Sequence, residues 1–211
     1  MRNLITDFLR RQAELAREIE GHFEIFFKDA AIPLPGKSRT EEGVVAHQIA
    51  GPDLPPPTAR TFDAITKERG LYVILTDYAV PGADACRFHS TFPALRAIYR
   101  GHSFNIRERV LGHLLNSEYI ALKQRQKQKP WGGYLKIRDG VPGDGGIDLL
   151  LEPEYLRAPS GHPYTWTVVT FEMPESSKAI RELAENGFSA AWGTPIRSVK
   201  EPNGRKARQP S

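Results

Sequence analysis

The sequence of 211 residues has a single cysteine, Cys86, which excludes an internal disulfide and any zinc site built from several thiolates. Uncharged apolar runs such as Leu149–Leu151 are far too short to cross a bilayer. The N-terminus has no apolar stretch followed by a small-residue cleavage site, so we expect no secretory signal. The chain contains 40% hydrophobic and 26% charged residues, which is typical of globular proteins. Together with these absences, this composition predicts a globular protein of the cytoplasm that does not associate with membranes.

Positive charge is in small excess, at a net +4, but it is unevenly distributed. Residues 99–138 carry nine Lys or Arg against two acidic residues, and clustered charge attracts polyanions better than dispersed charge. Four of these charges occupy alternate positions: Lys123, Arg125, Lys127 and Lys129. Alternation puts all four on one side of an extended segment, where they could follow a phosphate backbone. The other interpretation, a solvated helix end, stays open.

Hydrophobic periodicity and turn residues divide the chain into one domain and its appendages. They predict helices at 3–29, 105–122 and 176–191, and strands at 70–76, 94–99, 131–138, 146–151 and 164–171. The strands at 131–138 and 146–151 are expected to form a β-hairpin within an insert at about 123–160. Pro and Gly residues predict a loop over 31–60. The organisation is therefore a helix and connector at 1–60, a domain at 61–200, and a basic, disordered tail at 201–211.

The stretch from Tyr99 to His113 gathers the residues best suited to chemistry. Tyr99-Arg100-Gly101 ends a predicted strand, and Asn105 is the expected N-cap of the following helix, with Glu108 three residues on as in a capping box. Arg109 and His113 are four residues apart and therefore share one face of that helix. Without further context, we would interpret this pair as part of a solvated helix face.

Together with Gly70-Leu71-Tyr72, this stretch resembles the GIY-YIG nuclease family. Gly70 and Gly101 stand for the motif glycines, and Arg109 and His113 fall at the family's spacing after the second tyrosine, Tyr99. The resemblance covers residues 70–198, with long inserts. It implies a small α+β fold whose three-stranded, mostly antiparallel sheet is packed by helices. It also implies an endonuclease that hydrolyses DNA phosphodiester bonds with Mg²⁺ or Mn²⁺.

The resemblance also assigns roles to individual residues. It implies Tyr72 as general base, assisted by Tyr99 or His113, and Arg109 as the residue that clamps phosphate. Glu185 matches the metal-binding glutamate, with Glu182 as its nearest rival. One carboxylate suits Mg²⁺, which keeps most of its waters. Arg100 and Lys136 join the four alternating charges as expected DNA contacts.

The sequence departs from the family at several points. The motif tyrosines are 27 residues apart, more than in the usual short hairpin, and Ser198 stands where the family often has asparagine. Two alternatives therefore stay open. The chain could be a nucleic-acid-binding module that keeps the fold without turnover, or a basic scaffold whose N-terminal helix mediates dimerisation. The oligomeric state is not fixed by the sequence.

Overall fold

A computed structural model describes residues 2–80, 86–88, 94–133, 135, 137 and 146–198. Lys136, the expected turn at 139–145 and the predicted tail at 201–211 lie outside these residues. No helix within the described ranges is long and apolar enough to cross a membrane.

The fold is α+β, as predicted, but its antiparallel sheet has four strands rather than three. In spatial order, the strands are β1 (Val44–Ala50), β4 (Trp166–Glu172), β2 (Gly70–Thr76) and β3 (Arg96–Ser103). The strand expected at 70–76 is confirmed, whereas the one expected at 94–99 begins two residues later and continues to Ser103.

The additional strand, β1, comes from the segment predicted to be a loop, and that prediction is wrong for residues 44–50. β1 pairs along its length with β4, with Val44 opposite Phe171 and His47 opposite Val168. The prolines and glycines that suggested a loop flank this strand rather than interrupt it. The segment before residue 60 therefore supplies one edge of the sheet.

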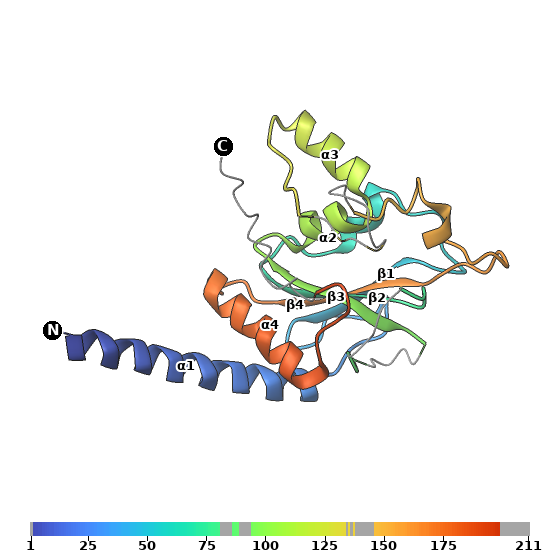
Figure 1. Cartoon of the computed structure of the whole chain (residues 1–211). Helices are drawn as coiled ribbons and strands as arrows, with labels where there is room; N and C mark the ends of the chain where they lie inside the picture. The colour runs from blue at the N-terminus through green and yellow to red at the C-terminus, as the bar shows by residue number, and fades with distance from the viewer. Residues whose placement is uncertain are drawn as a thin grey trace, which may run out of the picture.

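The helices cover both faces of the sheet (Figure 1). They are α1 (Arg2–Asp29), α2 (Ile106–Leu114), α3 (Asn116–Arg125) and α4 (Lys178–Trp192), with short 3₁₀ turns η1 (Ala59–Ala64) and η2 (Pro153–Tyr155). The single helix expected at 105–122 is two helices, because the backbone leaves the helical region at Leu115 (φ −141°, ψ 66°).

Strand β2 is buried on both faces, and its alternating side chains enter two separate cores. Tyr72 and Ile74 face α2 and α3, whereas Leu71, Val73 and Leu75 face α1 and α4. A central strand flanked by β3 and β4 is held rigidly by hydrogen bonds on both sides. Tyr72 therefore lies on a central strand that is hydrogen-bonded to neighbouring strands on both sides.

Helix α1 is docked to the domain only through its C-terminal part (Figure 1). There, the Asn186 side chain donates a hydrogen bond to Glu20, and the Trp192 indole donates to the carbonyl of Phe27. Phe27 also packs against Phe188 of α4, with ring centroids 5.4 Å apart. The N-terminal half of α1 extends past α4 into solvent.

The described part of the insert does not form the predicted hairpin. Residues 131–133, 135, 137 and 146–151 include no strand, although Leu115 and Asp148 form an isolated bridge. The amides of Ile147 and Leu149 donate to the carbonyls of His113 and Leu114 instead. This segment therefore supports the α2–α3 junction.

Candidate active site

The two motif glycines occupy positions where a side chain would collide with a neighbouring strand. Tyr72 of β2 lies opposite Gly101 of β3. A Cβ at Gly101 would lie 2.6 Å from the Tyr72 hydroxyl oxygen, and one at Gly70 would overlap the carbonyl oxygen of Phe171. Gly101 thus leaves the space that the Tyr72 phenol occupies.

Tyr72, Tyr99 and His113 form one compact cluster above the sheet. The Tyr72 hydroxyl and His113 Nε2 are 2.9 Å apart and share a hydrogen bond. The Tyr99 ring centroid lies 6.1 Å from that of Tyr72 and 4.7 Å from that of His113. Three residues from β2, β3 and α2 therefore meet at one point.

Burial sets the protonation states of this cluster. Desolvation, with Arg109 as a second cause, lowers the pKa of His113 to about 3, so its imidazole is neutral at physiological pH. Desolvation and the neighbouring Tyr99 raise the pKa of Tyr72 well above 10. Burial and the Glu185 carboxylate also raise the pKa of Tyr99. All three groups are therefore uncharged at physiological pH.

Arg109 lies beside this cluster and has an unused hydrogen-bonding group. Its guanidinium carbon is 3.1 Å from the ring centroid of Trp131, a cation–π arrangement. Its Nη1 is buried and has no hydrogen-bond partner among the residues that the structure describes. Buried polar groups are normally paired, so an unpaired donor beside a groove calls for an explanation such as a bound ligand. An oxyanion is the natural partner for such a donor.

Glu185 projects from α4 toward the same region from the other side of β3. Its side chain is 17% exposed, and its Oε2 lies 3.3 Å from Nη1 of Arg100. Arg100 is itself fixed, because its Nε donates to the Ser189 hydroxyl at 2.8 Å. The rival Glu182 lines the same groove, described below, but its side chain is 53% exposed and pairs with Lys178. Of the two glutamates, Glu185 is the one whose carboxylate is held among the motif residues.

Ser198 closes the far side of the site. Its hydroxyl accepts a 2.7 Å hydrogen bond from the Arg100 amide and donates a 3.0 Å hydrogen bond to the Arg100 carbonyl. A serine at this position thus ties the C-terminal segment to the exposed edge of β3. Arg197 adds a backbone hydrogen bond to Ile98.

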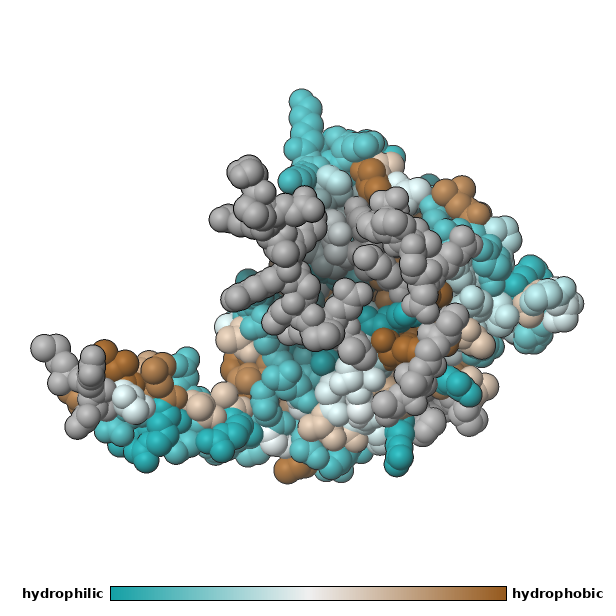
Figure 2. Space-filling model, in the orientation of Figure 1, coloured by the Kyte–Doolittle hydropathy of each residue, from teal (hydrophilic) through white to brown (hydrophobic). Residues whose placement is uncertain are grey.

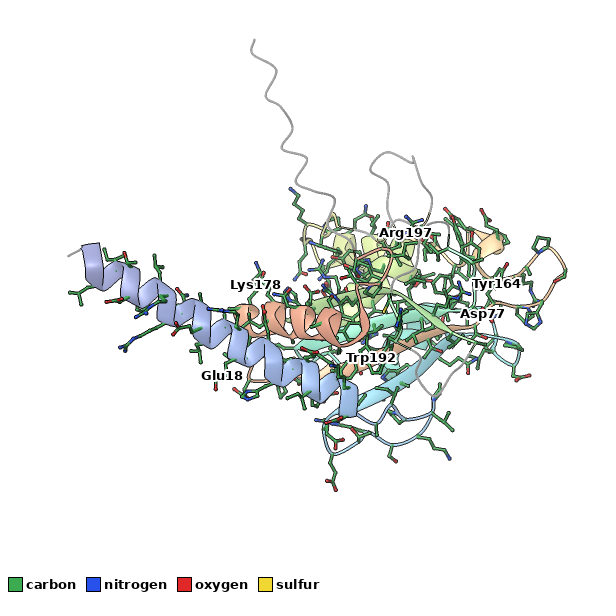
Figure 3. All side chains as sticks on the ribbon, turned by 60° about the horizontal axis from the view of Figure 1, so that its bottom comes forward. Glu18, Asp77, Tyr164, Lys178, Trp192 and Arg197 are labelled. Carbon is green, nitrogen blue, oxygen red and sulfur yellow. The ribbon has the colours of Figure 1, made fainter. Side chains whose placement is uncertain are left out.

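A groove of about 810 Å³ connects these residues to solvent. Its walls carry Tyr72, Tyr99, Arg109 and Glu185, while His113 lies behind Tyr72. A second groove of about 530 Å³ borders Tyr99 and Glu185 on the side of Arg100 and Ser198. Lys178, which also borders the first groove, is labelled at the start of α4 in Figure 3.

Sequence reasoning did not assign several residues that line the first groove. Among them, Trp131 follows the basic run and His102 follows the motif glycine Gly101. Helix α1 contributes four further residues: Gln12, Leu15, Ala16 and Ile19. No local pattern places this helix beside the motif residues, because its position depends on docking to α4.

The structure contradicts the prediction that four alternating charges share one side of an extended segment. Lys123 and Arg125 belong to α3, and Lys127 follows in a turn with φ 54°. Lys123 is buried, and its ammonium contacts Glu108 at 2.6 Å and Gln128 at 2.9 Å. Lys123 therefore forms an ion pair with Glu108. Of the four alternating charges, Arg125, Lys127 and Lys129 are the exposed ones.

The predicted capping box is only half formed. The Asn105 side chain accepts from the Glu108 amide, as expected for an N-cap, whereas the Glu108 carboxylate pairs with Lys123. Lys136 lies outside the described residues.

The described residues include no cluster of three or more His, Cys, Asp or Glu side chains that could hold a metal ion. A single carboxylate beside two grooves nevertheless fits a Mg²⁺ ion that keeps most of its waters. Comparison with protein-family models, curated proteins and solved structures found no match to the chain.

Proposed function

We propose that the protein is a metal-dependent endonuclease that hydrolyses DNA phosphodiester bonds. The observation that carries this proposal is the buried, unpartnered Nη1 of Arg109 beside the hydrogen-bonded Tyr72–His113 pair, on one groove with Glu185. The groove thus offers a donor for a phosphate oxygen, a path for a proton and a carboxylate for a cation. These are the functions that phosphodiester hydrolysis needs.

The proton path runs from the attacking water to Tyr72 and then to His113. As the water oxygen bonds to phosphorus, its proton passes to the Tyr72 oxygen, and the phenolic proton passes to His113 Nε2. The P–O bond to the ester oxygen breaks with its electron pair going to that oxygen, which leaves as an alkoxide and takes a proton from solvent water. This path requires the His113 tautomer whose lone pair is on Nε2, which the 2.9 Å contact allows.

Substrate binding would raise the pKa of His113 and so make its imidazole a better proton acceptor. In the free protein, the phenol pKa lies above 10 and that of the imidazole is about 3, so proton transfer between them is strongly unfavourable. A phosphate on Arg109 would offset the positive charge that helps to lower the His113 pKa. His113 would therefore be a stronger base with substrate in the groove than in the free protein, although burial, the larger cause of its lowered pKa, would remain.

Glu185 would hold the cation, which when bound stabilises negative charge on the phosphate and the leaving oxygen. The exposed Arg125, Lys127 and Lys129 precede Trp131, which borders the groove, and are proposed to contact the DNA backbone beside it. Arg100 is engaged with Glu185 and Ser189, so we assign it a role within the site rather than a contact with DNA.

A second candidate is a nucleic-acid-binding module without turnover. The ion pair between Arg100 and Glu185 favours it, because a guanidinium 3.3 Å from the carboxylate competes with a metal cation. Under this alternative, Arg109 would still bind phosphate but no bond would break.

Nicking of supercoiled plasmid in the presence of Mg²⁺ or Mn²⁺, measured together with filter binding, tests both candidates. The nuclease proposal expects cleavage by the wild type and loss of cleavage, with binding retained, in Tyr72→Phe and in Glu185→Gln. Glu182→Gln is the matched control and should cleave normally. Binding without cleavage by the wild type would support the second candidate, and cleavage by Tyr72→Phe would exclude Tyr72 as the base.

A further inference from the structure

The projecting half of α1 carries the most conspicuous exposed apolar surface among the described residues. Five large side chains on it are 56–74% exposed: Leu4, Ile5, Phe8, Leu9 and Leu15. Figure 2 shows apolar residues gathered toward the end of this arm, away from the body. Together they expose on the order of 500 Å², more than the scattered apolar residues of a typical monomer surface.

The spacing of these residues is that of a helix-pairing seam. Ile5, Phe8, Gln12, Leu15 and Ile19 follow one another at alternating intervals of three and four, the pattern that keeps one stripe facing a partner helix. The stripe leads toward the end of α1 that packs on α4. The domain therefore buries one end of a longer stripe and leaves the other end uncovered.

Charged residues are unevenly distributed along α1, and their distribution favours one direction of pairing. Residues 2–13 contain three arginines and one aspartate, whereas residues 14–24 contain four glutamates and one arginine. Two parallel copies would place like charges side by side. In the antiparallel arrangement that sets residue 5 level with residue 15, Arg2 lies level with Glu18 of the second copy and Glu14 lies level with Thr6. Only the arginines next to the axis, Arg10 and Arg11, then lie near their own copies.

We propose that the projecting half of α1 pairs antiparallel with the same helix of a second copy of this chain. The uncovered stripe runs from Leu4 to Leu15. The two-fold axis of the dimer therefore passes near the level of Arg10, and Ile5 lies opposite Leu15 of the second copy. Matching stripes bury on the order of 1,000 Å² in total, at the lower limit for a specific interface. The dimer therefore dissociates on dilution.

Pairing also extends the groove. Leu15 and Ala16 line the groove described above, and they lie where the first turn of the second copy's α1 would pack. The second copy therefore adds a wall to each groove. The dimer itself does not depend on the nuclease proposal, because it follows from the apolar stripe and charge pattern of α1 alone.

Sedimentation velocity of the full chain over a range of concentrations tests the dimer. The wild type should be dimeric at high concentration, and Phe8→Glu should be monomeric at every concentration with unchanged circular dichroism. Ile25→Glu is the matched control, because Ile25 is also a large exposed residue of α1 but lies outside the projecting half; this variant should remain dimeric. A monomeric wild type, or a dimer that survives Phe8→Glu, overturns the proposal.

Oxidative crosslinking tests the direction. The double variant I5C/L15C should form a covalent dimer, because residues 5 and 15 of one helix are roughly 15 Å apart and cannot bond to each other. Ile5→Cys alone should not crosslink, since antiparallel pairing separates the two copies of residue 5 by roughly the same distance. Crosslinking of the single variant would show parallel pairing and refute the proposal.

Discussion

The buried imidazole of His113 should make the protein unusually sensitive to acid. In the unfolded chain, this histidine takes up a proton near its usual pKa of 6.5, whereas in the folded protein it does so only near pH 3. Between these values, the unfolded state binds more protons, so the free energy of unfolding falls as the pH falls. The loss begins below pH 6.5 and is complete near pH 3.

The size of the effect follows from the same two pKa values. Linkage gives a loss of about 2 kcal/mol between pH 7 and pH 5, and about 3 kcal/mol by pH 4. At roughly 2–4 °C per kcal/mol for a chain of this length, the melting temperature should fall by about 4–8 °C between pH 7 and pH 5 from this group alone.

Urea unfolding of the wild type and His113→Gln at pH 7, 6, 5 and 4 isolates this contribution. The variant will have lower stability at pH 7, because it loses the hydrogen bond to Tyr72, but its stability should decline less with acid. Other titrating groups affect both proteins equally. His162→Gln replaces an exposed histidine and should keep the wild-type pH dependence. Parallel curves for the wild type and His113→Gln would refute the assignment of a buried, neutral imidazole.

Three further substitutions test the site and its support. Arg109→Lys keeps the positive charge but loses the planar guanidinium, so single-turnover cleavage should slow by on the order of 10²-fold or more. A rate near that of the wild type would show that Arg109 contributes only its charge. Ser198→Ala removes two hydrogen bonds to Arg100 and should lower the free energy of unfolding by about 1–3 kcal/mol in urea, with Ser198→Thr less affected. Lys123→Met should lower stability by about 1 kcal/mol and leave filter binding of DNA unchanged, because its ammonium contacts Glu108 inside the protein; weakened DNA binding would contradict this.

The elements that carry Tyr72, Arg109 and His113 could be predicted from the sequence because local signals indicate them. The apolar run at Gly70–Thr76, the N-cap at Asn105 and the i, i+4 spacing of Arg109 and His113 are each decided within a few residues. The structure places the side chains so selected around one groove. Whether they perform the proposed chemistry stays a prediction.

The errors arose where distant partners decide the structure. β1 has little alternation of its own, and it becomes a strand by pairing with β4, more than 100 residues later. The charge of Lys123 suggested a surface contact, but its partner Glu108 lies one helix earlier, across a break that periodicity did not reveal. The stacking of Trp131 on Arg109 likewise depends on how the chain after α3 returns to α2.

The strand order β1-β4-β2-β3 also constrains how the chain can fold as it is synthesised. β2, β3 and α2 are contiguous along the chain and can form a local unit that already contains Tyr72, Tyr99, Arg109 and His113. β1 and α1 are made first, yet their partners β4 and α4 are made last. Until then β1 has no neighbour in the sheet, and such unpaired strands invite aggregation. Glu185 arrives with α4, so the nascent chain completes the half that is proposed to bind phosphate long before it gains the carboxylate proposed to hold a cation.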